Sequence, residues 1–186
     1  MKPFSSYTPP FSYSGGKSQL APQICGLFRK HFPNESHIIS PFLGGGAVEL
    51  RWMHNGGTCL GADVDPHVVL LWKWLIEAPR EVAECAAQFM PIDIDTWHDW
   101  YSEMMSSEWH LLAHAAKYFI LRYTKVVHAF SPWEKRLIAF NAPKVYLPAF
   151  HRLAQFRAPR LDVECADFRD FLNNHDSLAY LSLIHI

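Results

Sequence analysis

The stretch that decides the fold is His37–Asp65, which reads HIISPFLGGGAVELRWMHNGGTCLGADVD. The apolar run at 38–39 is typical of a buried strand, and a Pro-Phe-Leu segment with three glycines follows it. Apolar residues then recur at helical spacing as far as Asn55, where an Asn-Gly-Gly sequence favours a helix end. A second apolar strand at 58–62 leads to Asp63. The stretch predicts a β-α-β unit with a glycine loop after its first strand and an acid at the tip of its second.

Such a unit suits a nucleoside ligand. Glycines lack a Cβ, so backbone N–H groups of the loop can approach a ligand, and the helix N-terminus adds positive potential. An acid at the end of the next strand can accept both ribose hydroxyls. The residues after Gly46 do not complete the G-x-G-x-x-G fingerprint of dinucleotide sites, so a glycine turn without a ligand is the alternative.

A second glycine segment, Phe11–Ser18, precedes the first predicted helix. Its Gly-Lys-Ser sequence is similar to part of a P-loop, but Phe11 stands where that motif needs a glycine, so we expect no triphosphate site. An aromatic residue, two glycines and a lysine can instead stack on a base and hold a carboxylate. A core position for Tyr13 and a solvated position for Lys17 are the alternatives.

Composition indicates a globular protein. The chain has 186 residues, 49% of them hydrophobic and 19% charged, which is enough for one domain with a substantial core. No apolar run could span a bilayer, and residues 1–16 lack the apolar centre of a signal peptide. The four cysteines form no C-x-x-C pair and indicate reduced thiols in a cytoplasmic protein. The eleven histidines show no metal-ligand spacing, so we expect no metal.

Charge is unevenly distributed along the chain. Residues 1–108 carry a net charge of −5, residues 109–161 carry +8 with Glu134 as their one acid, and residues 162–186 carry −4. A basic block within a nearly neutral chain is typical of a segment that faces a polyanion. A solvated helix face is the alternative.

Periodicity predicts helices over most of the remaining chain. We expect the first helix to bury Leu20, Ile24, Leu27 and Phe28, and a helix over 93–105, capped by Asp95 or Thr96, to bury a stripe from Trp97 to Met104. The other expected elements are helices over 66–78, 80–89, 109–125 and 148–156, an irregular segment over 126–140, a turn at 140–143, strands at 161–165 and 177–181, and a short helix that ends at 172. The pattern is that of an α/β fold interrupted by a helical, basic insertion from about Pro91 to Pro148.

Five short motifs, taken in order, resemble those of the Dam-type DNA adenine-N6 methyltransferases, the D12 class. They are Phe11–Lys17, similar to an aromatic-x-Gly-Gly-Lys motif; Ser40–Gly46, similar to a Pro-Phe-x-Gly-x-Gly loop; Gly61–Asp65; Phe140–Pro143; and Cys165–Phe168. The resemblance covers nearly the whole chain and implies an incomplete Rossmann-like, S-adenosylmethionine-dependent methyltransferase core with an inserted helical target-recognition region. The implied divisions are 1–90 and 149–180 for the core, 91–148 for the insertion and 181–186 for a non-native tail.

The resemblance also implies a set of cofactor-binding residues. Tyr13 and Lys17, with Ser14, Gly15 and Gly16 between them, would contact the methionine end of S-adenosylmethionine; Pro41, Phe42, Gly44 and Gly46 would form the loop that closes on it; Asp63 would bind the ribose hydroxyls; and Asp167 with Phe168 would frame the adenine. Ser40 stands where many relatives carry an acid, so the hold on the methionine ammonium group is expected to be weaker.

The family's catalytic Asp-Pro-Pro-Tyr motif should follow a strand at 179–181, and it is absent. That motif's carboxylate and carbonyl accept the two hydrogens of the adenine amine, while its aromatic ring stacks on the flipped-out base. The sequence instead reads LSLIHI from Leu181, which resembles a translated sequencing adapter. We therefore expect a truncated read that has no catalytic residue and transfers no methyl group.

In this interpretation the basic block contacts DNA. The candidates for phosphate contacts are Arg122, Lys125, Lys135, Arg136 and Lys144. We expect a monomer that binds double-stranded DNA, with a restriction endonuclease as a further candidate partner. Two other interpretations are a non-catalytic nucleoside- or DNA-binding module and an NAD-dependent oxidoreductase, although the latter gives the Gly-Gly-Lys motif no place.

Overall fold

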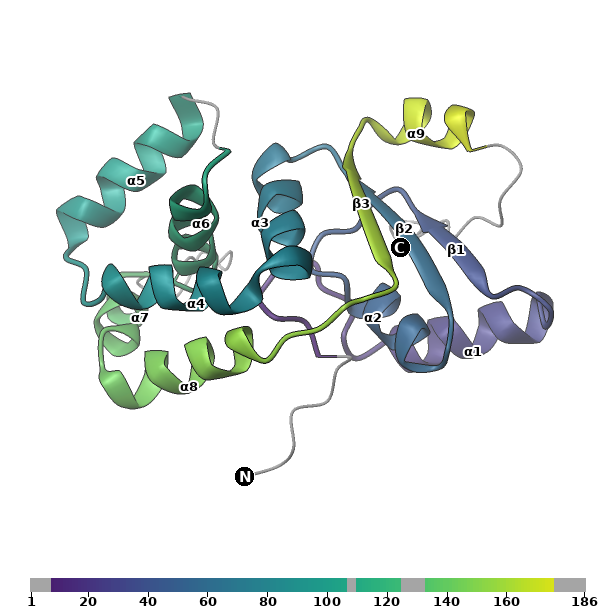
Figure 1. Ribbon diagram of the computed structural model, residues 1–186, viewed down its shortest axis with the longest axis horizontal. Coiled ribbons are helices and arrows are strands. Elements are labelled where there is room, and N and C mark those ends of the chain that lie inside the picture. The colour runs from purple at the N-terminus through teal and green to yellow at the C-terminus, as the bar shows by residue number, and fades with distance from the viewer. Residues whose placement is uncertain (1–7, 107–109, 125–132, 176–186) are drawn as a thin grey trace. The chain divides into compact units, whose positions relative to one another are not determined.

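The computed structural model describes residues 8–106, 110–124 and 133–175 (Figure 1). Its elements, in chain order, are α1 (Ala21–His31), β1 (His37–Ser40), α2 (Ala47–His54), β2 (Thr58–Asp63), α3 (Pro66–Glu77), α4 (Pro79–Gln88), α5 (Ile94–Ser106), α6 (Leu112–Thr124), α7 (Trp133–Phe140), α8 (Pro143–Ala154), β3 (Leu161–Cys165) and α9 (Phe168–Asn174). The described residues form two compact units, and the division between them falls within α3. The first unit holds 8–9, 15–69 and 157–175; the second holds 10–14, 70–106, 110–124 and 133–156.

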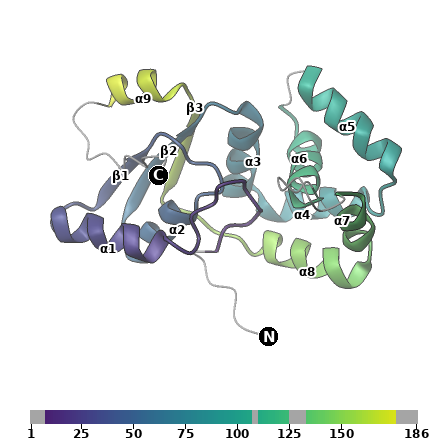
Figure 2. The same ribbon diagram turned by 180° about the vertical axis from the view of Figure 1, so that it is seen from behind.

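The first unit is built on a parallel sheet in the order β1-β2-β3. Alternation along the strands directs Ile39, Leu60 and Ala62 to one face, where Ile39 and Ala62 pack against Phe171 of α9. Helices α1 and α2 lie on the side of the sheet that faces the viewer in Figure 2. These helices pack on each other partly through Phe28 and Trp52, whose rings meet edge to face at 5.3 Å between centroids.

The predicted β-α-β unit is confirmed as β1, α2 and β2, and the predicted strand at 161–165 is β3. The buried face predicted for α1 is wrong at two positions, because Leu20 is 51% exposed and Leu27 is 58% exposed. The buried residues of α1 are Ala21, Cys25 and Phe28. The small side chains of Ala21 and Cys25 let α1 approach α2 closely. A prediction based on large apolar residues does not reveal this.

The second unit is helical, with α4 packed against both α6 and α8. Aromatic side chains fill much of its interior. The Tyr123 and Phe140 ring centroids lie 4.8 Å apart, and Phe150 lies 6.0 Å from Phe140. Trp72 contacts Phe11 at 5.5 Å and Phe156 at 5.8 Å. The unit therefore holds the short segment 10–14 through a buried aromatic contact.

Several predictions for this unit need correction. Residues 133–140 form helix α7 instead of an irregular segment, because Leu137 and Phe140 share a buried face. Helix α8 begins at Pro143 and not at Pro148, since proline at the first helical position is well tolerated and Pro148 sits inside the helix. Residues 126–132 and the strand predicted at 177–181 lie outside the described residues.

The first turn of α5 is capped by Asp93, and not by Asp95 or Thr96 as predicted. The Asp93 Oδ1 atom accepts a hydrogen bond from the Thr96 N–H at 2.7 Å. Downstream, Trp97 is a core residue as predicted, because it is buried and its indole N–H donates to the Thr124 hydroxyl at 2.7 Å.

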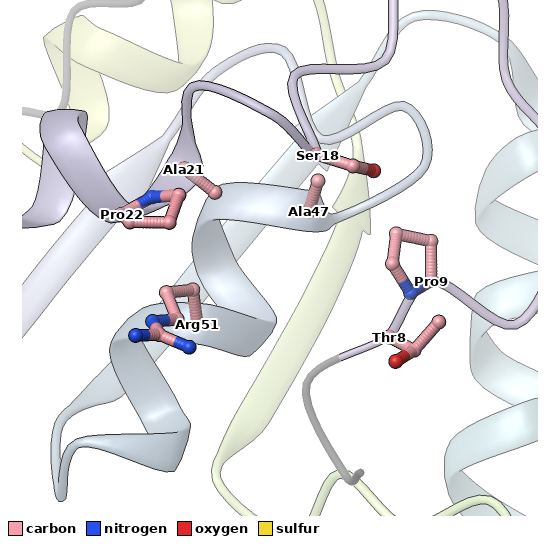
Figure 3. Close-up of a pocket in the computed structure, with 7 residues that line it drawn as sticks. All are labelled: Thr8, Pro9, Ser18, Ala21, Pro22, Ala47 and Arg51. Atoms are coloured by element: carbon pink, nitrogen blue, oxygen red, sulfur yellow. The ribbon is translucent and has the colours of Figure 1, made fainter. Parts of the chain in front are cut away.

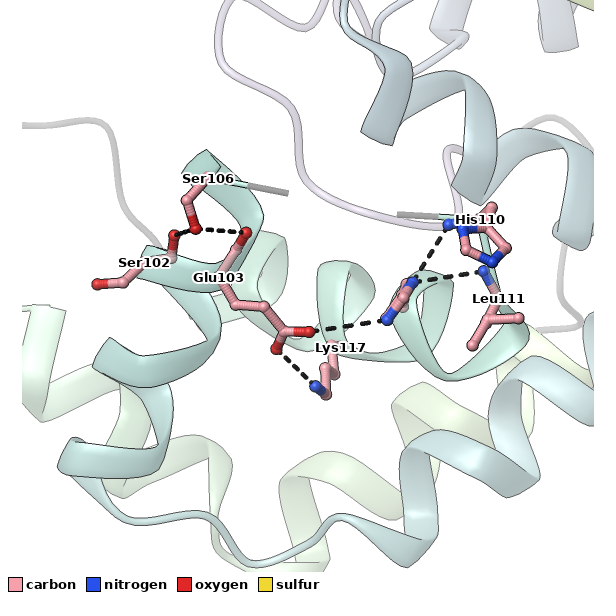
Figure 4. Close-up of polar contacts among 7 residues, drawn as sticks. Ser102, Glu103, Ser106, His110, Leu111 and Lys117 are labelled. Carbon is pink, nitrogen blue, oxygen red and sulfur yellow. Dashed lines mark hydrogen bonds and ion pairs between the residues drawn. The ribbon is translucent and has the colours of Figure 1, made fainter. Parts of the chain in front are cut away.

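A polar cluster connects α5 to α6 (Figure 4). Glu103 accepts a hydrogen bond from Lys117 at 2.8 Å and lies 3.7 Å from Nε2 of His114. The other ring nitrogen of His114 accepts from the backbone N–H groups of His110 and Leu111, ahead of the first residue of α6. Lys117 and His114, two residues of the basic block, therefore face an acid of the protein itself.

Asn141 fastens the two ends of a long chain segment. Its Oδ1 accepts from the Ile92 N–H at 3.1 Å, and its Nδ2 donates to the Ile92 carbonyl at 2.6 Å. These residues lie close to the two ends of the predicted insertion. The division at 91–148 and the Rossmann-like extent of the core nevertheless stay predictions, while the combination of helices with a small parallel sheet is that of an α/β protein.

We expect Asn141→Ala to lower the free energy of unfolding by about 1–2 kcal/mol, because the backbone N–H and carbonyl of the buried Ile92 lose their partner. Urea unfolding followed by circular dichroism measures this change. Asn34→Ala, at an exposed position before β1, is the matched control and should change stability little. Equal stability of the two variants would contradict the fastening role.

Candidate functional site

The carboxyl ends of the three parallel strands lie along one edge of the sheet, which is where ligands bind in open α/β folds. Ser40 ends β1, and Asp63 ends β2 in register with Cys165 at the end of β3. The segments that follow these strands carry several of the predicted cofactor-binding residues. The structure therefore brings residues from three separate motifs to this edge.

Two aromatic rings meet at this edge. Phe42, after β1, and Phe168, at the start of α9, have ring centroids 5.3 Å apart with an interplanar angle of 35°. Phe42 is 42% exposed, which is unusual for a large apolar side chain that has a ring partner. The Arg169 guanidinium also lies over Phe168, at 5.1 Å. An exposed aromatic face of this kind can stack on a planar heterocycle.

Asp63 holds the glycine loop in place. Its Oδ2 atom accepts from the Gly44 N–H at 2.8 Å, and its Oδ1 accepts from the Asp65 N–H at 3.0 Å. The side chain is only 7% exposed, and this burial raises the pKa of the Asp63 carboxyl, whereas the two backbone hydrogen bonds oppose the rise. Gly44 has a φ of 48° and Gly46 a φ of 67°, a conformation that favours glycine.

The loop crosses directly over the end of β2. The Leu43 N–H donates to the Ala62 carbonyl at 2.8 Å. A Cβ atom added to Gly61 would lie 2.9 Å from Cδ1 of Leu43, so a larger residue here would require the Leu43 side chain to move. Gly61 thus leaves space for Leu43 of the loop, and Asp63 holds the loop by a hydrogen bond to Gly44.

Glu49 is a residue of this site that the sequence analysis missed. It lies in the first turn of α2, and its Oε1 accepts from the Ser40 hydroxyl at 2.6 Å. Burial is the main cause that raises the pKa of the Glu49 carboxyl from 4.5 to about 7. An acid within the apolar stripe 47–53 was the available signal, and it was interpreted only as a departure from a dinucleotide fingerprint.

The N-terminal motif divides between the two units. Gly15, Gly16 and Lys17 belong to the first unit, and Tyr13 and Ser14 to the second. The Lys17 ammonium donates to the Gly15 carbonyl at 2.6 Å, and Gly15 has a φ of 75°. Lys17 also accepts hydrogen bonds on its carbonyl from the start of α1.

Asp167 has a structural role in the described chain. It is the N-cap of α9, and its side chain accepts from the Arg169 N–H at 2.9 Å. Pro41 connects β1 to the ring of Phe42. Asp167 and Pro41 thus directly precede the two residues, Phe168 and Phe42, whose rings meet at the sheet edge.

A pocket of about 200 Å³ lies elsewhere in the first unit (Figure 3). Its lining comes from the N-terminal segment, the beginning of α1 and α2, namely Thr8, Pro9, Ser18, Ala21, Pro22, Ala47 and Arg51. None of the predicted cofactor-binding residues lines it, although Ser18 and Ala47 follow two of them directly in the chain. We assign this pocket no role.

The candidates for DNA contacts are only partly described. Arg122 places its guanidinium 4.6 Å from the Tyr13 ring centroid and 5.9 Å from that of Tyr118, so it is engaged within the protein. Lys144 is exposed in the first turn of α8. Lys125 and the side chains of Lys135 and Arg136 lie outside the described part of the chain.

A family model described as D12 class N6 adenine-specific DNA methyltransferase matches residues 13–181. The chain belongs to this D12 class. The resemblance inferred from five motifs is thereby confirmed, and with it the assignment to DNA adenine-N6 methyltransferases in general. No curated protein matches the D12 chain.

Among the residues of the D12 chain that the structure describes, no three His, Cys, Asp or Glu side chains gather as ligands of a metal ion would. None of the helices in that part of the chain combines the length and apolarity that crossing a membrane requires.

Proposed function

We propose that the chain binds S-adenosylmethionine at the carboxyl edge of its sheet and double-stranded DNA through its basic block, as part of site-specific adenine-N6 methylation. The observation that carries the proposal is the match of the D12 model over residues 13–181. The bond from Gly44 to Asp63 supports the location, because it orders a glycine loop beside a carboxylate at a strand end.

The residues at the edge fit an adenine nucleoside. Phe42 and Phe168 offer apolar ring faces to the adenine. Each Asp63 oxygen accepts one backbone N–H and keeps a lone pair that can accept a ribose hydroxyl. Gly44 and Gly46 present backbone without side chains to the ligand. Pro41 and Asp167 position these groups.

The methionine end is assigned to the N-terminal motif. Lys17 would pair with the cofactor's carboxylate, and Tyr13 would contact the same end. Ser14, Gly15 and Gly16 supply the turn between them, in which Gly15 adopts a positive φ. When bound, S-adenosylmethionine supplies an electrophilic methyl group on a sulfonium. We assign no catalytic residue.

Calorimetric titration with S-adenosylmethionine and, separately, NAD tests the proposal. We expect saturable binding of S-adenosylmethionine and none of NAD. NAD binding alone would favour the oxidoreductase interpretation and overturn the proposal. A non-catalytic module is the second candidate. Incorporation of tritiated methyl groups into DNA, by a chain extended through Asp-Pro-Pro-Tyr, separates the module from the enzyme. A cytoplasmic monomer and a restriction endonuclease partner remain predictions.

For DNA, we expect Lys144→Ala to weaken binding of any duplex sequence and to reduce the slope of log affinity against log salt by about 1, since one phosphate contact is lost. Fluorescence anisotropy with a labelled duplex over a salt series measures both quantities. Lys30→Ala on α1, an exposed lysine outside the basic block, is the control. An unchanged slope for Lys144→Ala would remove this residue from the interface.

A further inference from the structure

A buried acid lies at the same sheet edge. The Glu49 side chain is 1% exposed and Ser40 is fully buried, and the two are joined by a hydrogen bond of 2.6 Å. Ser40 is the last residue of β1, and Glu49 is in the first turn of the helix that follows the glycine loop. The carboxylate of Glu49 therefore stands at the carboxyl end of β1, although its backbone does not.

This carboxylate faces no cationic side chain in the described structure. None of the ion pairs among the described residues involves Glu49. The charge of Glu49 acts on the thiols of Cys25 on α1 and Cys59 on β2. Burial first, and Glu49 second, raises the pKa of both thiols, that of Cys25 to about 11. Burial disfavours the ionised form of this carboxyl, and a cation bound beside it would favour that form.

Ser40 can transmit this charge. Its hydroxyl has one proton, which it donates to Glu49, and so its remaining lone pairs can only accept. Ser40 directly precedes Pro41 and Phe42, at the start of the glycine loop. A cation that donates to the Ser40 oxygen would therefore sense an ionised carboxylate one hydrogen bond away.

We propose that Glu49 supplies, through Ser40, the negative charge that holds the ammonium group of the cofactor's methionine part. Glu49 is thus a positioning residue, and it offsets the absence of an acid at position 40. The inference rests on the proposed function and adds to it the assignment of one subsite. It also replaces the expectation that serine at position 40 weakens the hold on the ammonium group.

S-adenosylmethionine carries two cations, the ammonium and the sulfonium, and two related compounds separate them. S-adenosylhomocysteine keeps the ammonium and lacks the sulfonium. 5′-Methylthioadenosine lacks both the sulfonium and the amino-acid group. If Glu49 serves the ammonium, its charge should matter for S-adenosylmethionine and S-adenosylhomocysteine alike and be irrelevant for 5′-methylthioadenosine.

The experiment is calorimetry of the full chain with all three compounds. Glu49→Gln keeps an acceptor for Ser40 and removes the charge, and we expect it to weaken S-adenosylhomocysteine binding roughly ten- to hundredfold while leaving 5′-methylthioadenosine affinity unchanged. Ser40→Asp combined with Glu49→Gln returns a carboxylate to the same place. This double variant should again bind S-adenosylhomocysteine more tightly than Glu49→Gln does. Glu77→Gln, at an exposed position that ends α3, is the matched control.

The pH profile of the unmodified chain gives a second measurement. Its affinity for S-adenosylhomocysteine should rise between about pH 5.5 and about pH 8, as Glu49 ionises near pH 7, and the profile of Glu49→Gln should be flat. A flat profile of the unmodified chain overturns the inference even if Glu49→Gln fails to fold. Loss confined to S-adenosylmethionine would assign the charge to the sulfonium and also overturn it. Absence of binding by the unmodified chain would instead reject the proposed function.

Discussion

Raising the pH from about 4.5 to about 8 is expected to remove about 3 kcal/mol from the free energy of unfolding through Glu49 alone. Burial raises the pKa of this carboxyl from 4.5 to about 7, so the folded chain holds a proton that the unfolded chain has released. The stabilisation is complete below pH 4.5 and is lost as the pH rises through 7. Glu49→Gln should remove this dependence and make the chain more stable at pH 8. Urea unfolding at a series of pH values measures both effects.

Cys25 and Cys59 do not confuse this measurement, because burial raises the pKa of both thiols and keeps them neutral over the same window. Glu77→Gln should retain the slope of the unmodified chain, since its carboxylate is exposed. A Glu49→Gln chain that is less stable than the unmodified one at pH 8 would contradict the argument. Together with the binding experiment, the expected result would show that Glu49 lowers the free energy of unfolding at pH 8 and contributes to ligand binding.

The second large effect is expected for Asp63→Asn, which should weaken S-adenosylmethionine binding by about a hundredfold. The carboxylate accepts from Gly44 and from Asp65, one on each oxygen. An asparagine has one accepting oxygen, and its NH2 group would face the other backbone N–H. The glycine loop would lose its attachment, and the ribose hydroxyls would lose an acceptor.

Calorimetry measures the loss of affinity, and thermal unfolding shows how much of it comes from the loop. Asp162→Asn, an exposed position on β3, is the matched control and should bind normally. Binding by Asp63→Asn with unmodified affinity would exclude Asp63 from the cofactor site, whatever its contribution to stability.

Local patterns predicted part of this fold. The β-α-β unit follows from apolar runs, a glycine loop and a helix stop within one continuous stretch, and the strand at 161–165 follows from its own five residues. Helix α7 was missed because eight residues give little periodicity. The start of α8 was placed too late, because Pro148 suggested a start that Pro143 provides. Leu27 was misplaced because packing against α2 selects small residues that hydrophobicity does not favour.

The site was predicted less fully than the fold. Motif order indicated Asp63, Phe42 and Phe168. These residues lie near one another because the parallel strands that precede them end at the same edge of the sheet. The sequence did not reveal that Asp63 anchors Gly44, nor that Glu49 reaches Ser40, because both contacts join residues through space. Similarly, a count of basic residues could not distinguish Lys144, which is exposed, from Lys117, which already pairs with Glu103.

The link between Asn141 and Ile92 has a consequence for how this type of protein can diversify. Because one amide joins both ends of the intervening chain, the separation of those ends does not depend on what lies between them. We therefore expect the described parts of that interval that do not pack against α4 or α8 to tolerate exchange for those of another D12 chain, with the attachment points in register. Under the proposed function, we expect such exchanges to alter the preferred DNA sequence and to leave cofactor binding unchanged.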